Sequence, residues 1–147
     1  MLRGIWMAIK SFNKRRGISV DSENSQTARV LVIDDDITAL DIVSFMLEEK
    51  GFCVERCVDG YSAIESVHKI SPSLIVVDLM MPGINGIQTV QEIRARGYAA
   101  VPIIAFTALD DPRVHDEARD AGCDLVLTKP CRPERLLQHI EKLLANH

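Results

Sequence analysis

The sequence has no Cys-x-x-Cys pair and no long apolar run, and each absence argues against a class of protein. Its four cysteines lack the spacing of a zinc site and any secretory context, so we expect buried, reduced thiols at Cys53, Cys57, Cys123 and Cys131. No apolar stretch approaches the roughly 20 residues that a transmembrane helix needs. The expected location is therefore cytoplasmic.

The greater part of the chain also has no excess of positive charge. Residues 1–30 contain six Lys and Arg against two acidic residues, whereas residues 31–147 contain eleven against nineteen. Because an acidic domain repels the phosphate backbone, we expect no nucleic acid among its partners.

Residues 1–28 differ in character from the rest. Residues 1–16 place apolar side chains at helical spacing with basic residues towards one end, which predicts a short amphipathic helix for a membrane surface or a partner's groove. The alternative is an extension without function, since this length is marginal for an isolated helix in water. Residues 21–28 are typical of a polar linker. We therefore expect a basic amphipathic segment and a linker over residues 1–28, and a single domain over residues 29–147.

From residue 29 onward, short apolar runs alternate with stretches of helical period. The expected strands are 30–33, 53–58, 74–77, 103–106 and 125–127; the expected helices are 38–50, 62–70, 87–96, 112–121 and 133–145. This alternation predicts an α/β fold with a doubly wound, five-stranded parallel sheet. Ligand sites of such folds lie at the carboxyl ends of the strands.

Polar side chains follow four of the five predicted strands. The first ends in Asp34-Asp35-Asp36, the third in Asp78, the fourth in Thr107 and the fifth in Lys129. Each has an ordinary explanation alone, because Asp caps helices, Thr ends strands and a lone Lys is usually solvated. Together, however, the carboxylates would repel one another unless protons or a cation neutralised them. A hard cation fits best, because all-oxygen ligands favour Mg²⁺, for which Mn²⁺ can substitute.

This set of groups suits phosphoryl transfer to a carboxylate. An Asp side chain is a legitimate covalent nucleophile towards phosphorus. Lys129 would supply a positive charge to the transferred group, and the Thr107 hydroxyl would donate a hydrogen bond to one of its oxygens. A bound cation would offset the charge that keeps a phosphodonor away from a carboxylate.

Four motifs carry these residues: VLVIDDD, LIVVDLMMPGINGIQ, PIIAFTA and AGCDLVLTKP. In this order and spacing they resemble the receiver domain of response regulators, and the resemblance covers nearly all of residues 29–146. It implies a flavodoxin-like (βα)5 fold with strand order 2-1-3-4-5.

The resemblance also implies a role for each residue of the metal and phosphoryl site. Asp78 would be the phosphorylated residue. Asp34 and Asp35 would form the acidic metal pair, with Asp35 binding directly and Asp34 partly through water. The backbone carbonyl of Met80 would be a further metal ligand, and Asp36 would lie outside the first shell.

Further roles follow from the same resemblance. Thr107 would be the switch hydroxyl and Lys129 the phosphoryl contact. A cis peptide would precede Pro130, and Gly83 and Gly86 would shape the loop after the phosphorylated strand.

The sequence departs from the common family pattern at three positions. Val126 stands where many receivers have an aromatic residue, Cys131 where Phe is frequent, and Leu125 where a polar residue is common, which suggests an exposed apolar side chain. In this family the residues two after the phosphorylated Asp and two after the Thr flank the path of the hydrolytic water, and the resemblance implies that here they are the apolar Met80 and Leu109. We therefore expect slow self-dephosphorylation, because neither side chain can orient a water.

The resemblance implies a stand-alone, chemotaxis-type response regulator that is not an enzyme. Its only chemistry would be its own phosphorylation and dephosphorylation at Asp78. It would accept a phosphoryl group on Asp78 from a sensor histidine kinase or a histidine phosphotransfer protein. With no output domain expected after the last helix, output would be the binding of an unknown protein near the fourth and fifth strands and helices. A phosphorelay shuttle or a phosphate sink is the alternative.

Two rivals come from other classes. Residues 34–38, DDDIT, also resemble the Asp-x-Asp-x-Thr signature of haloacid-dehalogenase-type phosphatases, with Asp34 as nucleophile, although this leaves Asp78 and the MPGING loop unexplained. A flavodoxin-like electron carrier shares the topology, but acidic strand ends would repel a flavin phosphate.

Overall fold

The computed structural model describes residues 27–147. The amphipathic segment expected over residues 1–16, and most of the linker, lie outside this part of the chain.

Five strands and five helices alternate along the described chain. The strands are β1 (Arg29–Ile33), β2 (Cys53–Cys57), β3 (Leu74–Val77), β4 (Ile103–Thr107) and β5 (Leu125–Thr128). The helices are α2 (Ile37–Glu49), α3 (Gly60–Ile70), α4 (Gly86–Ala95), α5 (Pro112–Ala121) and α6 (Pro133–Ala145). Every element expected from the sequence is present, and the differences lie only at the ends of the elements.

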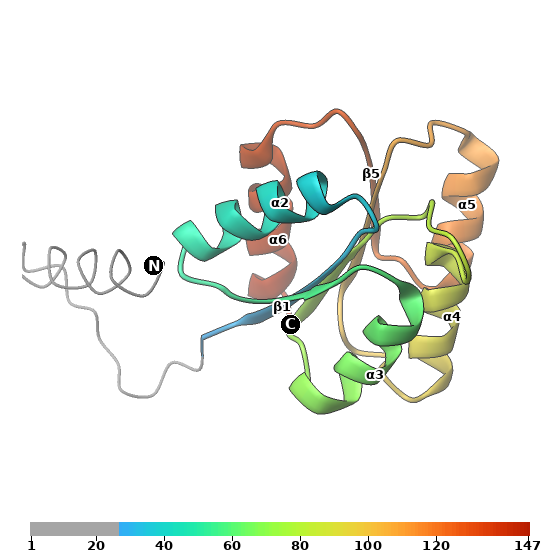
Figure 1. The fold of residues 1–147 in the computed structure, drawn as a ribbon, viewed down its shortest axis with the longest axis horizontal. Coiled ribbons are helices and arrows are strands. Elements are labelled where there is room, and N and C mark those ends of the chain that lie inside the picture. Colours follow the sequence, from blue (N-terminus) through green and yellow to red (C-terminus); the bar gives the residue numbers. More distant parts are fainter. Residues whose placement is uncertain (1–26) are drawn as a thin grey trace, which may run out of the picture.

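The strands form one parallel sheet in the order β2-β1-β3-β4-β5, which confirms the predicted flavodoxin-like topology. Helices α2 and α6 lie on one side of the sheet, and α3, α4 and α5 lie on the other (Figure 1). The three-layer arrangement explains why β3 is buried along its whole length, because successive side chains of a strand point to opposite, equally covered faces.

The core consists of one apolar cluster on each face of the sheet. On one side Leu31 and Ile75 pack with residues of α3, α4 and α5, and on the other Val32 and Val76 pack with residues of α2 and α6. Neighbouring residues of the same strand thus belong to different clusters. This packing fixes the register of the strands, and with it the positions of the residues that follow their carboxyl ends.

Short polar side chains start the helices immediately after the strands. Asp36 accepts hydrogen bonds from the backbone N–H groups of Thr38 and Ala39 at the start of α2, Asp59 caps α3, and Asp111 caps α5. A side-chain oxygen at this position satisfies N–H groups that have no partner within the helix. These caps therefore fix where the three helices begin, at the edge of the sheet where a ligand site is expected.

Two expectations need correction. The prediction of buried thiols is correct for Cys57 and Cys123, but Cys53 is exposed because β2 is an edge strand, and Cys131 is half-buried. Burial raises the pKa of the Cys123 thiol to about 12. Leu125 is not an exposed apolar residue: it is partly buried and packs against the cluster beneath α2 and α6.

The helices found between residues 27 and 147 include none that combines the length and the apolar character needed to cross a bilayer.

Candidate functional site

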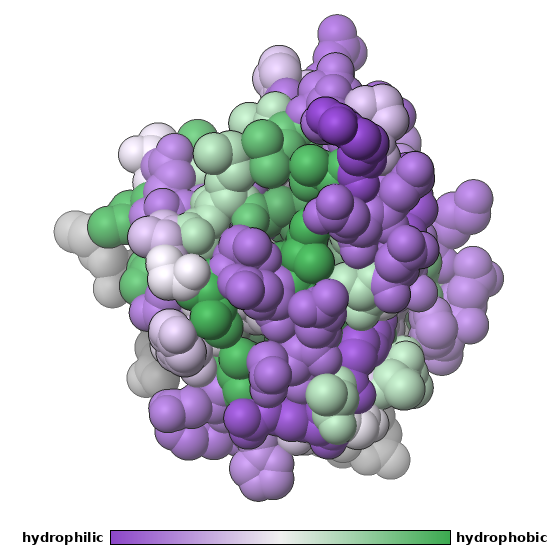
Figure 2. Space-filling model, turned by 90° about the vertical axis from the view of Figure 1, so that its right-hand side faces the viewer, coloured by the Kyte–Doolittle hydropathy of each residue, from purple (hydrophilic) through white to green (hydrophobic). Residues whose placement is uncertain are grey.

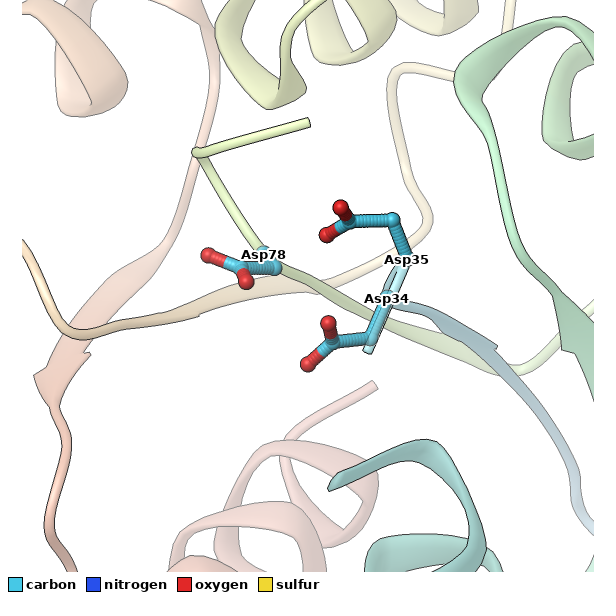
Figure 3. Close-up of side chains that lie close together, drawn as sticks. All are labelled: Asp34, Asp35 and Asp78. Carbon is cyan, nitrogen blue, oxygen red and sulfur yellow. The ribbon is translucent and has the colours of Figure 1, made fainter. Parts of the chain in front are cut away.

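The carboxyl ends of β1 and β3 bring three carboxylates together. Ile33 of β1 pairs with Val77 of β3, so the next residues, Asp34 and Asp78, are neighbours across the sheet. Asp35 turns towards the same space, and Figure 3 shows the three side chains around one small volume. One oxygen from each carboxylate lies within 4.8 Å of the others. The cluster that the sequence predicts at this edge is therefore present.

Asp34 is the most buried member of the cluster, with 5% of its surface exposed. Its Oδ1 accepts a hydrogen bond from the Asp36 backbone N–H at 2.9 Å, and its Oδ2 lies 2.7 Å from the Lys129 ammonium. The same ammonium is 3.6 Å from Oδ2 of Asp78. Lys129 thus joins the ends of β1, β3 and β5, and its shorter contact is with Asp34 rather than with Asp78.

Asp78 has an environment that both resists and supports ionisation. Burial raises the pKa of its carboxyl group, and the Asp34 charge adds to this effect, whereas Lys129, the Met80 backbone N–H and the Thr107 hydroxyl lower it. The Met80 N–H donates to Asp78 Oδ1 at 3.2 Å. The pKa is raised on balance, which is typical of a carboxylate that reacts in a partly desolvated site.

Thr107 and Lys129 are held by the last two strands. Thr107 is completely buried at the end of β4, and its carbonyl accepts a hydrogen bond of 2.7 Å from the Lys129 backbone N–H. The Lys129 ammonium also lies 5.2 Å from the centre of the Phe106 ring. The Lys129–Pro130 peptide is cis, as the family resemblance implies. The pairing of the last two strands and the Phe106 ring therefore hold Lys129 beside the carboxylate cluster.

The two glycines of the β3–α4 loop have different structural functions. Gly83 has φ +79°, a left-handed conformation that side chains rarely adopt. Gly86 is buried, and a Cβ there would clash with the carbonyl oxygen of Asp78. The start of α4 can approach the end of β3 only because residue 86 has no side chain.

The donor set of the cluster suits a hard divalent cation. Asp34, Asp35 and Asp78 offer only carboxylate oxygens, and their mutual repulsion is offset by the single ammonium of Lys129. Asp35 is exposed and makes no ion pair with Lys129, so it is the carboxylate most available to an entering ion. The cluster is therefore consistent with the divalent-metal site of receivers, while the Met80 carbonyl as a ligand stays a prediction.

The two residues expected to flank the path of water have different exposure. Met80 has 56% of its surface exposed, whereas Leu109 is partly buried and packs on the cluster beneath α3, α4 and α5. Sequence reasoning missed Phe106 beside Lys129, and it missed His115, whose ring contacts the Leu109 carbonyl. Nothing in the spacing of these residues indicates such contacts, because they arise only when separate segments meet.

Comparison with known proteins agrees with this geometry. The family described as response regulator receiver domain matches residues 30–141. The chain belongs to this family. Receivers are phosphoacceptor switches rather than enzymes, and histidine kinases phosphorylate them. The family assignment thus removes the phosphatase alternative with Asp34 as nucleophile.

Curated relatives and solved structures lead to the same family. The chain is 36% identical over 117 residues to the DNA-binding dual master transcriptional regulator RpaA of Synechocystis sp., covering 79% of this chain and 48% of that protein. The regulatory protein VanRB of Enterococcus faecalis is 34% identical over 116 residues, with 79% and 52% covered. This receiver chain therefore spans about half the length of these relatives.

Among solved structures, the chemotaxis protein CheY4 of Vibrio cholerae superposes with a TM-score of 0.77 at 31% identity, covering 80% of this chain and 99% of that one. The receiver domain of the Francisella response regulator 1452 has a TM-score of 0.76 at 29% identity, with 82% and 98% covered.

Proposed function

We propose that this receiver accepts a phosphoryl group on Asp78 in a Mg²⁺-dependent reaction and thereby changes its affinity for a partner protein. The donor would be a sensor histidine kinase or a histidine phosphotransfer protein. The observation that carries the proposal is the position of Asp78, which lies between two further carboxylates, the Lys129 ammonium and the Thr107 hydroxyl.

The roles of the side chains follow from these contacts. A carboxylate oxygen of Asp78 would attack the phosphorus of a donor phosphohistidine whose other ring nitrogen carries a hydrogen. The O–P bond would form as the N–P bond breaks, and the imidazole would leave as the neutral ring. The Met80 N–H holds Oδ1 of Asp78, which leaves Oδ2, on the side of Lys129, for the attack. Lys129 and Thr107 would then bind oxygens of the phosphoryl group.

Asp34, Asp35, Asp78 and the Met80 carbonyl would hold Mg²⁺, or Mn²⁺ in its place. When bound, the ion supplies positive charge that offsets the repulsion between the carboxylates and the incoming phosphoryl oxygens. A bound ion would also weaken the ion pair between Lys129 and Asp34, because the ammonium would no longer be the main positive charge beside Asp34.

A stand-alone mode of action finds support in the match to CheY4, of which nearly the whole length is covered. We place the output surface over α5, β5 and α6, beside the strand ends that carry Thr107 and Lys129. Figure 2, which views the molecule from the side of α4 and α5, shows hydrophobic residues within a largely hydrophilic surface. The large hydrophobic side chains that are exposed, such as Ile37, Tyr61 and Met80, lie on α2, α3 and the loop after β3, so the proposed output surface rests on its position beside Thr107 and Lys129 rather than on an apolar patch. Val126 replaces the usual aromatic, so coupling from Thr107 to this surface would not use a ring rotamer.

The decisive experiment measures the intact mass of the protein after incubation with phosphoramidate or acetyl phosphate, with and without Mg²⁺. We expect a gain of one phosphoryl group in the wild type that depends on Mg²⁺ and is absent in Asp78→Asn. Asp36→Asn is the matched control, because Asp36 lies beside the cluster but caps α2, and Asn is an equally good cap. No gain in the wild type, or a gain in Asp78→Asn, would refute the proposal.

A further inference from the structure

Two hydrogen bonds hold the backbone of Leu109 in the loop between β4 and α5. Nε2 of His115 lies 2.6 Å from the carbonyl oxygen of Leu109, and the backbone N–H of Leu109 donates to Oγ1 of Thr107 at 3.2 Å. A chain of two hydrogen bonds therefore runs from a side chain of α5, through one residue of the loop, to the hydroxyl at the end of β4.

We propose that His115 is a positioning residue for phosphotransfer, which holds the Leu109 peptide and through it directs the Thr107 hydroxyl towards Asp78. The inference rests on the proposed function of Asp78. It assigns a role to a residue that touches neither the phosphoryl acceptor nor the carboxylate cluster.

The direction of the first hydrogen bond is fixed by chemistry. A carbonyl oxygen can only accept, so Nε2 of His115 must carry a hydrogen. Both the neutral ring protonated on Nε2 and the imidazolium meet this condition, and only the tautomer protonated on Nδ1 alone does not. The backbone of His115 is held in the first turn of α5, where its N–H donates to the Asp111 carbonyl at 3.0 Å.

The second hydrogen bond restricts the Thr107 hydroxyl. A hydroxyl has one hydrogen to donate, and here its oxygen already accepts from Leu109. The hydrogen is therefore free for another acceptor, and the pairing of Val77 with Ala105 places the end of β4, with Thr107, beside the end of β3, which Asp78 follows. Because Thr107 is fully buried, water does not compete for the hydroxyl. Loss of the Leu109 contact would let the hydroxyl turn to other acceptors.

The variants His115→Met and His115→Gln separate the hydrogen bond from the packing of the ring. The Gln side-chain amide can place an N–H near the position of Nε2, whereas Met fills similar space without a donor. We expect His115→Met to take up a phosphoryl group from phosphoramidate about three to ten times more slowly than the wild type, as the loss of one hydrogen bond implies. His115→Gln should recover most of that rate.

A double-mutant cycle with Thr107→Val tests the route. If His115 acts through the Thr107 hydroxyl, His115→Met should cause no further slowing in the Thr107→Val background. An equal slowing in both backgrounds would overturn the proposal in favour of a general structural role. Equal rates for the wild type and His115→Met would overturn it as well.

NMR of the wild type tests the contact without any phosphotransfer. We expect the ¹⁵N shifts of His115 to show a hydrogen on Nε2, and the amide of Leu109 to exchange with solvent faster in His115→Met than in His115→Gln. A ring protonated on Nδ1 alone would overturn the proposal. A wild type that takes no phosphoryl group but shows this NMR signature would instead contradict the function proposed for Asp78, so the two failures are distinguishable.

Discussion

The Lys129 ammonium lies 2.7 Å from Asp34 and 3.6 Å from Asp78. It therefore forms its closer ion pair with a carboxylate that we place in the metal site, not with the phosphoryl acceptor. A divalent cation bound beside Asp34 would share one small, partly buried volume with the ammonium, so two cations would repel each other there. Phosphoryl transfer needs Lys129 near the acceptor, so binding of the cation and repositioning of the ammonium should be linked.

Replacement of Lys129 by Met should strengthen Mg²⁺ binding and weaken phosphotransfer. Removal of the ammonium takes away a like charge beside the ion, so we expect the dissociation constant for Mg²⁺ to fall by about threefold to tenfold. Titration calorimetry measures this constant directly. Phosphorylation by phosphoramidate at saturating Mg²⁺ should slow by about tenfold or more, because a donor to the phosphoryl group is lost.

Asp35→Asn should change Mg²⁺ affinity in the direction opposite to Lys129→Met. This exposed carboxylate makes no contact with Lys129, so its loss should weaken Mg²⁺ binding while the melting temperature changes little. Tighter Mg²⁺ binding by Asp35→Asn, or weaker binding by Lys129→Met, would contradict our account of the site.

Asp78→Asn should stabilise the fold at neutral pH in the presence of a chelator. Burial and the Asp34 charge raise the pKa of Asp78, so folding disfavours the ionised form. This cost is absent when pH is below the ordinary value of 3.8, where the carboxyl is protonated in both states, and it grows as pH rises through the raised pKa. We expect the variant to melt about 2–5 °C higher at pH 7.

The advantage of Asp78→Asn should shrink towards zero as pH falls below 3.8, where the carboxyl is protonated in both the folded and the unfolded protein. Thermal melts across this range, with Asp36→Asn as a control that keeps its capping role, measure the difference. If the difference in melting temperature between Asp78→Asn and the wild type grew on acidification, the sign of the pKa shift would be wrong.

The phosphorylated protein should lose its phosphoryl group slowly. Met80 and Leu109 are apolar, so neither can orient a hydrolytic water. Met80→Glu, at an exposed position, should speed the loss about threefold to tenfold by giving water a hydrogen-bond partner near Asp78. The decay of the intact mass measures both rates, with Ile42→Glu, exposed on α2, as the control. Decay of the wild type within seconds would refute this prediction.

Arg94 should be the most important cation for stability at the opposite end of the sheet. Its guanidinium donates to the carbonyl groups of Tyr98, Val101 and Gly122 and pairs with Asp124 at 3.2 Å. Arg94→Met would leave these carbonyls without their donor, so we expect a loss of about 2–4 kcal/mol in the free energy of unfolding.

Arg96→Met is the matched control for Arg94→Met. Arg96 lies two residues further along the chain and makes one exposed ion pair of 3.8 Å with Glu92. Such pairs contribute little, and we expect a change within about 0.5 kcal/mol. Urea unfolding of both variants measures the difference. Similar losses would mean that the network around Arg94 does not stabilise the fold.

The sequence by itself determined the order and type of the elements. Continuous apolar runs such as residues 74–77 predict strands covered on both faces, and Gly51, Gly97 and Gly122 mark the ends of helices, all with positive φ in the structure. It also located the acidic cluster, because parallel strands all present their carboxyl ends at the same edge of the sheet.

Contacts between distant segments were decided only by the tertiary structure. Asp34 and Lys129 are 95 residues apart, and no local pattern shows that the ammonium lies closer to Asp34 than to Asp78. Cys53 is exposed and Leu125 is partly covered for a similar reason, since burial depends on which strand is at the edge and which helix lies above. Local propensity and periodicity act over a few residues, whereas distances in the site depend on how the sheet and its two helical layers pack together.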